Sequence, residues 1–440
     1  MRSAAKYSEL LGFYQPNMFH LHVHTKLNLK RWREWDDTTL CTFFHEYIHF
    51  LQDISTVSGL YNIYVIGERL QDAVVNHIYP NGSGAISVPI NCANVTNNVN
   101  NNRILNNYYQ GNSPDATNIN FESLQVADKP ISISHQIKVN GAFVDVSEIR
   151  VSCKGSAETF LLGSFQITES MAYLAEKIVY GANVMDPSPN YPYCTVEQIA
   201  HYYSDDLYNN KSLLFALCDL SLCYSHSGKV LLRFFDIYVN EGCPKDYRDF
   251  LVHLVSDAMV ASNIPGVATY QQGVKSFANE AIQSLNHRFK GWNFADVRSW
   301  YTHVISTAIK WRIENPMFML DLVEGGELKH NIVFQKFMDA IGTPLMSNDN
   351  NELYSKNGKC WLSHVSEKRM ALLLAAGSIF YMLMGDSFCC ELKVYCPLLG
   401  FKVSRQCEVE PWTKVKLFRP CPYGYLWYGW KLKDFRLVRK

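Results

Sequence analysis

Residues 40–51 read LCTFFHEYIHFL, an apolar stretch that contains the pattern His-Glu-x-x-His at positions 45–49. The apolar residues around the pattern predict a buried helix, on which His45 and His49 lie on one face because they are four residues apart. Two imidazoles at this spacing can bind one metal ion, and neutral imidazole is a good zinc ligand. Glu46 lies next to them and can take a proton from a metal-activated water. The stretch therefore predicts a metal-dependent hydrolase.

The composition is that of a folded globular protein without a strong overall electric field. The chain has 440 residues, of which 48% are hydrophobic, 13% aromatic and 19% charged. This length exceeds that of one compact domain. Because the 41 basic and 41 acidic residues cancel, we expect neither nucleic acid nor a membrane surface as a partner.

Three further features indicate the compartment. Residues 1–15 contain no apolar segment of the kind found in secretion signals. The 13 cysteines, an odd number spread through apolar segments, favour buried thiols in a reducing environment. The longest uncharged apolar run, residues 370–385, falls short of the roughly 20 residues that span a bilayer, and predicts a buried helix. We therefore expect a cytoplasmic protein.

Hydrophobic periodicity and turn residues give the expected elements of the first half of the chain. Residues 18–29 alternate and predict a strand. The motif helix is expected to have Asp37 or Thr38 as its N-cap and to end near residues 58–59, with a second helix at 61–77. An Asn-rich surface insertion is expected at about residues 80–130. Further expected elements are a hairpin formed by 131–139 and 142–146 around Asn140-Gly141, and a helix at 156–180 with Ser156 as its N-cap and Gly181 just beyond its end.

The second half of the chain is expected to be mostly helical up to about residue 345. Thr195 and Gln198 have the spacing of a capping box. The expected helices there are 195–210, 212–225, 229–240, 246–262, 268–288 and 294–314. The final 55 residues shift to Cys, Pro and aromatic residues with short β-like runs.

Two His side chains leave a tetrahedral ion one protein ligand short of a typical catalytic site. The segment after His49, FLQDIS, supplies no third His. Glu169 is the only charged residue between Glu158 and Glu176, on a predicted helix that is apolar nearly all round. An unpaired carboxylate there would cost several kcal/mol, so a metal ion is a natural partner. We expect Glu176 to lie too far along the helix to share the ion.

HEYIH on one helix and ITESMAYLAE on a later one (residues 167–176) resemble the gluzincin group of zinc metallopeptidases, to which thermolysin belongs. The resemblance implies that His45, His49 and Glu169 bind zinc and that Glu46 is the general base. It covers about a tenth of the chain, and the 120-residue step from His49 to Glu169 is far longer than in thermolysin-like enzymes. In zincins the edge strand of the sheet binds extended peptide by β-addition.

Other residues of such a site are less clearly marked. Glu46 is surrounded by apolar side chains, which raise the pKa of a carboxyl and suit a proton shuttle. Asp53, one turn past His49, is a candidate to orient that imidazole, although an exposed position is the commoner one for an Asp. Nothing in the sequence selects the donor for the oxyanion among Tyr173, Tyr193, His201, Tyr202 and Tyr203.

The fold class predicted from these patterns is α+β, mainly α. A zincin-like catalytic module with a small sheet is expected at 1–185, a helical domain at 186–385 and a Cys/aromatic-rich subdomain at 386–440. The active site is expected between the first two. The expected activity is hydrolysis of peptide bonds, with zinc as cofactor, a peptide or protein as substrate and a regulatory protein as a possible partner.

Two alternative functions remain open. His20, His22 and His24 resemble the first metal motif of PHP-type phosphoesterases, but Asp-x-His occurs nowhere in the chain and the middle lacks the β–α alternation of such a barrel. A polar strand face is the simpler interpretation of these residues. The other alternative is a zincin-fold interaction protein without activity, against which the intact Glu46 argues.

The last 55 residues contain a cysteine cluster that is a weaker candidate for a structural zinc site. Cys389, Cys390, Cys396, Cys407 and Cys421 lack the close Cys-x-x-Cys pairs of zinc ribbons. We interpret them as small buried hydrophobic residues.

Overall fold

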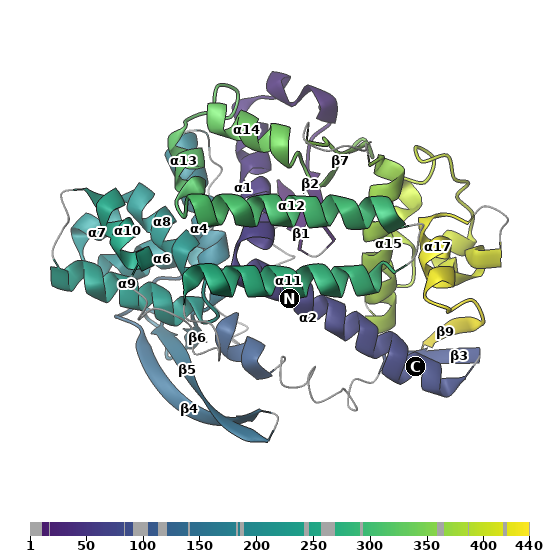
Figure 1. Cartoon of the computed structure of the whole chain (residues 1–440), viewed down its shortest axis with the longest axis horizontal. Coiled ribbons are helices and arrows are strands. Elements are labelled where there is room, and N and C mark those ends of the chain that lie inside the picture. The colour runs from purple at the N-terminus through teal and green to yellow at the C-terminus, as the bar shows by residue number, and fades with distance from the viewer. Residues whose placement is uncertain are drawn as a thin grey trace.

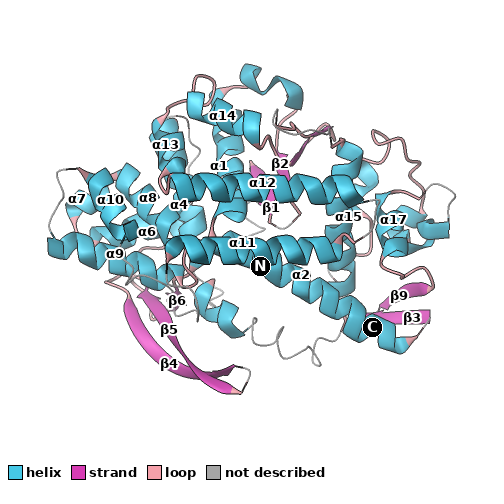
Figure 2. Ribbon diagram, in the orientation of Figure 1, coloured by secondary structure: helices cyan, strands magenta, loops and turns pink. Residues whose placement is uncertain are grey.

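The computed structural model describes residues 11–16, 18–82, 84–90, 104–112, 121–139, 141–181, 184, 189–241, 246–256, 269–290, 294–358, 365–385, 387–416 and 420–439. The fold is mainly helical with small sheets, as Figure 2 shows, in agreement with the expected α+β, mainly α class.

The α-helices are α1 (Asp37–Ser55), α2 (Val57–Asp72), α4 (Ser164–Val179), α5 (Asn190–Tyr193), α6 (Thr195–His201), α7 (Asp205–Asn209), α8 (Lys211–Ser221), α9 (Ser227–Glu241), α10 (Tyr247–Ser256), α11 (Tyr270–Arg288), α12 (Ala295–Glu314), α13 (Phe318–Glu324), α14 (Ile332–Ala340), α15 (Glu367–Met384), α16 (Gln406–Val409) and α17 (Pro422–Gly429). Short 3₁₀ segments are η2 (Leu29–Glu34), η4 (Tyr79–Asn81), η8 (Glu391–Val394) and η9 (Pro411–Lys416), and η3 (Ala73–Ile78) is a π-helical segment. The strands are β1 (Gly12–Gln15), β2 (His20–Val23), β3 (Gly84–Val88), β4 (Ile131–Val139), β5 (Ala142–Ser152), β6 (Thr159–Leu161), β7 (Leu345–Asn348), β8 (Leu353–Tyr354) and β9 (Phe435–Arg439).

Helix α1 carries the His-Glu-x-x-His pattern and lies in the interior. It is capped one residue before the expected position, because the carboxylate of Asp36 accepts a hydrogen bond from the Thr39 amide at 2.7 Å. It also ends earlier than expected, at Ser55, because the Thr56 side chain caps a separate helix, α2. The two helices meet so closely that a Cβ on Gly59 would lie 2.3 Å from the Cα of Asp53.

A four-stranded sheet of order β1-β2-β7-β8 lies against α1. Strand β2 is antiparallel to β1 and parallel to β7. The expected strand at 18–29 is thus confirmed over its first part only. Strand β7 falls in the range assigned to the helical domain, so the ranges 1–185 and 186–385 share one sheet.

The two faces of this sheet differ in chemistry. Tyr14 of β1 reaches α1, where its hydroxyl donates to Asp53 at 3.0 Å. Gly12 lies against the same helix, since a Cβ there would be 2.9 Å from Thr42 Cγ2. On the other face, Phe13 stacks on His22 of β2, with ring centroids 5.0 Å apart. This second face carries the polar imidazoles.

The expected hairpin forms as β4 and β5, which Figure 1 shows projecting from the helical body. Gly141 at its turn has a φ of 85°, as the Asn-Gly signal requires, whereas Asn140 lies outside the described residues. The expected helix at 156–180 begins only at Ser164. Residues 159–161 instead pair with β5 as β6, so Ser156 is not an N-cap. Gly181, with a φ of 70°, follows the helix end as expected.

The structure decides three expectations for the second half of the chain. Thr195 is the first residue of α6 rather than its N-cap, and the Gln198 side chain accepts from the Val126 amide. The prediction of a capping box is therefore wrong. Residues 370–385 belong to the buried helix α15, as expected. Of the short β-like runs expected in the last 55 residues, β9 forms, whereas the aromatic segment is helix α17, with Tyr423 and Trp427 buried.

The insertion at residues 80–130 is described only in part, because 91–103 and 113–120 lie outside the described residues. Its residue Asn112 contacts β6 and α4: Asn112 Oδ1 accepts from the Leu161 amide at 2.6 Å, and Gln166 Nε2 donates to the Asn112 carbonyl at 3.0 Å. In the described part of the chain, none of the helices combines the length and apolar character that crossing a bilayer requires.

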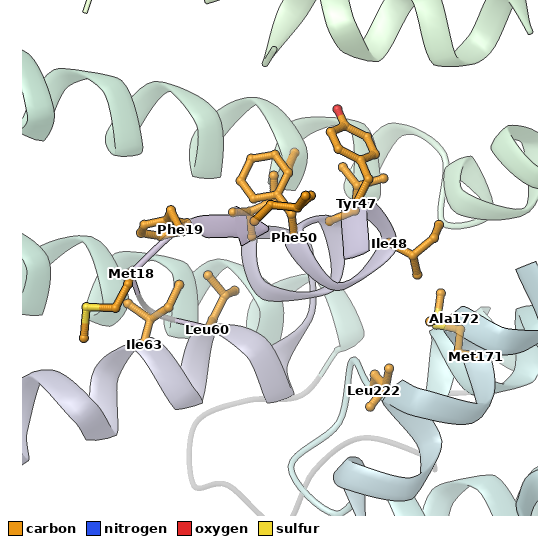
Figure 3. Close-up of a cluster of buried hydrophobic side chains, with 14 of the residues drawn as sticks. Met18, Phe19, Tyr47, Ile48, Phe50, Leu60, Ile63, Met171, Ala172 and Leu222 are labelled. Carbon is orange, nitrogen blue, oxygen red and sulfur yellow. The ribbon is translucent and has the colours of Figure 1, made fainter. Parts of the chain in front are cut away.

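The core surrounds α1 on several sides. Figure 3 shows Ile48 pointing toward Met171 and Ala172 of α4, while Phe50 and Tyr47 point away from that helix. These side chains are all fully buried. Helices α11 and α12 run side by side across the molecule, and both contact α1 (Figure 1). This packing fixes α1 against α4, which is the arrangement that builds the site.

Candidate metal centre

Two packed helices supply the candidate ligands. His45 and His49 lie one turn apart on α1, with ring centroids 4.8 Å apart. Glu169 lies in the second turn of α4, and the small Ala172 one turn later is fully buried. The close approach of α1 to α4 brings all three side chains to one point, as the sequence predicted.

The distances between these ligand atoms suit a bound ion better than direct hydrogen bonds. Glu169 Oε2 lies 3.7 Å from His45 Nε2 and 3.6 Å from His49 Nε2. Both exceed the usual 2.7–3.2 Å of a hydrogen bond. A tetrahedral zinc ion with ligands at about 2.1 Å would separate them by about 3.4 Å. The ligand atoms of the three residues all lie within 4.8 Å of one another.

Hydrogen bonds on the far side of each ring point the Nε2 atoms at this centre. His45 Nδ1 donates to Glu176 Oε1 at 2.9 Å. His49 Nδ1 donates to Gln52 Oε1 at 2.8 Å, while Gln52 Nε2 donates to the Thr168 carbonyl at 3.2 Å. With Nδ1 protonated, a neutral imidazole has its lone pair on Nε2. Both rings are therefore held in the form that binds a metal.

The structure shows what two neighbouring acids, Asp53 and Glu176, contact. Asp53 accepts a hydrogen bond from Tyr14, and the side chain that holds His49 Nδ1 is Gln52. Glu176 is not among the three convergent ligands, but it contacts His45 directly. Helical spacing could have indicated both residues, since Gln52 is three residues past His49 and Glu176 two turns past Glu169.

The charges around the centre favour a bound cation. Burial lowers the pKa of His45, but the charge of Glu176 and the other carboxylates outweighs it and holds this pKa well above its ordinary value. The pKa of His49 is also raised, since Glu169 outweighs burial. Burial raises the pKa of Glu169, but the charges of His49 and His45 bring it far below its ordinary value. Positive charge is thus favoured here, and a metal ion can replace these protons.

Glu46 lies beside the centre without belonging to the ligand group. Its side chain is buried, and burial raises its pKa despite the opposing charges of His45 and His49. A Cβ placed on Gly12 of β1 would be 3.5 Å from Glu46 Cγ, so this side chain lies next to β1, the outermost strand of the sheet among the described residues. The raised pKa agrees with the expectation from its apolar sequence context.

Of the candidate oxyanion donors, the structure places Tyr193 at the centre. Its ring centroid is 5.8 Å from that of His45. Burial, and then the charges of Glu169, Glu46 and Glu176, raise its pKa far above the ordinary value, so the phenol keeps its proton. Tyr202 instead donates to the Val126 carbonyl and His201 pairs with Asp205 on the surface. Sequence alone could not distinguish these residues.

A second group of convergent ligand atoms consists of His22, His24 and Asp349. His22 Nε2 lies 3.3 Å from Asp349 Oδ1, and His24 Nδ1 lies 2.9 Å from the same oxygen. His20 is not part of it, because its Nε2 contacts Ser347 Oγ at 2.8 Å. Burial lowers the pKa of His20 to about 3, and burial followed by the charge of His24 lowers that of His22.

The C-terminal cysteines are free thiols, and Cys390, Cys396 and Cys407 are buried, in agreement with their interpretation as small hydrophobic residues. Burial raises the pKa of the Cys421 thiol. Neither group of convergent ligand atoms found among the described residues includes a cysteine.

No protein-family model, curated protein or solved structure matches this chain. The resemblance to gluzincins therefore rests on the motifs at residues 45–49 and 167–176 alone. What the protein does must be inferred from the site itself.

Proposed function

We propose that this protein is a zinc-dependent metallopeptidase with a zincin-like catalytic module. One observation carries the proposal: His45, His49 and Glu169 aim two nitrogens and one oxygen at a common point, with N···O separations of 3.6 and 3.7 Å. Two His and one Glu are a ligand set of catalytic zinc, which keeps a further coordination position open. When bound there, zinc would polarise a substrate carbonyl and make a water molecule a better nucleophile.

Glu46 acts as the general base in this proposal. It takes a proton from the attacking water and returns it to the leaving amine. Two features support the assignment. Glu46 lies outside the ligand set, so it is free to exchange a proton, and its raised pKa brings its proton affinity closer to what such a shuttle needs.

Tyr193 is proposed as the donor that stabilises the oxyanion. Its protonated phenol lies near His45 and close enough to the three carboxylates to feel their charge. Removing a donor of this kind costs about 10²–10³ in kcat. Tyr193→Phe should show this loss with zinc content unchanged, and an unaltered kcat would exclude the role.

An extended peptide is the proposed substrate because of where β1 lies. This strand is an edge of the sheet within the described residues, and its Gly12 adjoins Glu46. An edge strand can pair with a peptide through main-chain hydrogen bonds. A peptide paired with β1 would therefore pass next to the general base.

The test is a pair of measurements on full-length protein, namely zinc per chain by mass spectrometry and cleavage of a pooled peptide library. Wild type should hold zinc at this centre and cleave. Glu46→Gln should hold as much zinc as wild type and lose about 10²–10⁴ in rate. Glu169→Ala should lose the zinc ion of this centre and the activity together. Glu68→Gln, a half-buried acid of α2 whose pKa is also raised by burial, is the matched control and should change neither.

The same measurements distinguish the alternatives. Zinc binding without cleavage by wild type would favour the inactive interaction protein. Equal cleavage by Glu46→Gln and wild type would exclude the proposed mechanism. If Glu169→Ala holds as many zinc ions per chain as wild type, the carboxylate ligand of this centre comes from elsewhere in the chain.

A further inference from the structure

The second group of convergent ligand atoms lies where two parallel strands end. His24 follows β2 and Asp349 follows β7, and these strands pair in parallel with His22 opposite Ser347. The carboxyl ends of parallel neighbours meet at one edge of a sheet. Topology therefore brings His22, His24 and Asp349 together although more than 300 residues separate them in sequence.

A chain of hydrogen bonds decides which nitrogen of His22 carries its proton. Gln15 Oε1 can only accept, so His20 Nδ1, at 3.2 Å, must be the protonated nitrogen of that neutral ring. His20 Nε2 then accepts the single proton of the Ser347 hydroxyl, at 2.8 Å.

The contact of Ser347 with His22 decides which nitrogen of His22 carries the proton. Because its hydroxyl proton is already donated to His20, Ser347 Oγ must accept from His22 Nδ1, which lies 2.8 Å away. The lone pair of neutral His22 is therefore on Nε2. This atom faces Asp349 Oδ1 at 3.3 Å, so the two acceptors need positive charge between them, either a metal ion or the proton of an imidazolium. Phe13 stacked on the ring holds it in this orientation.

We propose that His22, His24 and Asp349 form a second metal site, which binds one divalent ion of the zinc class. Two nitrogens and one carboxylate oxygen suit such a borderline ion. The His24 and Asp349 side chains are 32% and 37% exposed, so the ion keeps positions open to water.

The second site is separate from the His45 centre. Along β1, Gly12 and Tyr14 face α1, which carries His45, whereas Phe13 faces His22. The two sites thus lie on opposite faces of the sheet. Each can be tested without disturbing the other.

The experiment counts zinc in full-length protein that has been stripped with a chelator and dialysed against buffered zinc. Wild type should bind two ions per chain. His24→Ala and Asp349→Asn, both at exposed positions that tolerate substitution, should each bind one. The double variant His45→Ala/His49→Ala should also bind one. The matched control is His201→Ala, which removes an imidazole from an exposed His–Asp pair and should leave two ions.

The outcomes separate this inference from the proposed peptidase. One ion in wild type that is lost in His45→Ala/His49→Ala would overturn the second site and leave the first. One ion in wild type that is lost in His24→Ala would overturn the zinc centre at His45 and leave the second site. A second ion that persists in both His24→Ala and Asp349→Asn, or that is lost equally in His201→Ala, would also overturn the second site.

Ser347 supplies a further check, because it acts through His22 and not on the ion. Ser347→Ala should retain two ions at saturation but weaken zinc binding at the second site about 10–100-fold, the usual cost of losing a ligand's hydrogen-bond partner. Ser347→Thr, which keeps the hydroxyl, should restore the affinity. Equal affinities in wild type and Ser347→Ala would show that Ser347 does not orient His22. Circular dichroism confirms the fold of each variant.

Discussion

The imidazoles of His45 and His49 owe their orientation to partners that never touch the proposed ion. Glu176 accepts from one ring and Gln52 from the other, so each Nε2 is left to bind. Glu176 also adds negative charge, which raises the pKa of His45 and favours a cation at the centre. A residue that looked remote in sequence is thus a positioning residue for the site.

Glu176→Ala should weaken zinc binding at the His45 centre about 10–100-fold, because the ring loses its hydrogen-bond partner and its charge. Glu176→Gln should weaken zinc binding less, since its amide oxygen still accepts a hydrogen bond from His45 Nδ1. Competition with a chromophoric chelator measures both affinities. Glu158→Gln, a partly exposed acid that precedes α4, is the control. Wild-type affinity in Glu176→Ala would contradict the positioning role.

At the scale of elements, a buried ion pair fixes the helices around the end of α1. Arg312 of α12 is fully buried and pairs with Asp219 of α8, and its Nη2 also donates to Ser55 Oγ at 3.1 Å. Removing one partner leaves an uncompensated charge in the interior. The pair therefore links three helices at the C-terminal end of the helix that carries the candidate ligands.

Arg312→Met should lower the free energy of unfolding by about 3–5 kcal/mol, because Asp219 stays buried without its partner. The double variant Arg312→Met/Asp219→Leu should lower the free energy of unfolding by much less than the sum of the two single changes, since it removes both charges. Urea denaturation of the zinc-free proteins measures these values. Additive costs would show that the two residues do not interact.

Whole-molecule topology joins segments that the sequence assigned to separate domains. Strand β7 pairs with β2, and Asp349 after β7 meets His22 and His24. Helix α12 covers α1 from the far part of the chain. The ranges 1–185 and 186–385 therefore depend on each other for their packing.

A fragment of residues 1–185 contains His45, His49 and Glu169 but lacks β7 and α12. We expect it to lack cooperative thermal unfolding and to bind zinc at the His45 centre more weakly than the full chain, because apolar faces of α1 and the sheet stay exposed. Calorimetry and zinc titration of the fragment beside the full chain measure this. A fragment that unfolds cooperatively and binds zinc as tightly as the full chain would show that the module is autonomous.

The sequence alone predicted several features because they depend on neighbours along the chain. Helical spacing put His45 and His49 on one face, the Asn-Gly turn marked the hairpin, and an acid in an apolar helix indicated Glu169. Local pattern failed where partners are distant: Ser156 looked like a cap, but the residues after it pair with β5. Only the tertiary structure selected Gln52, Glu176 and Tyr193 around the first centre. It alone brought Asp349 to His22 and His24, because contacts across hundreds of residues follow from strand pairing and helix packing rather than from local periodicity.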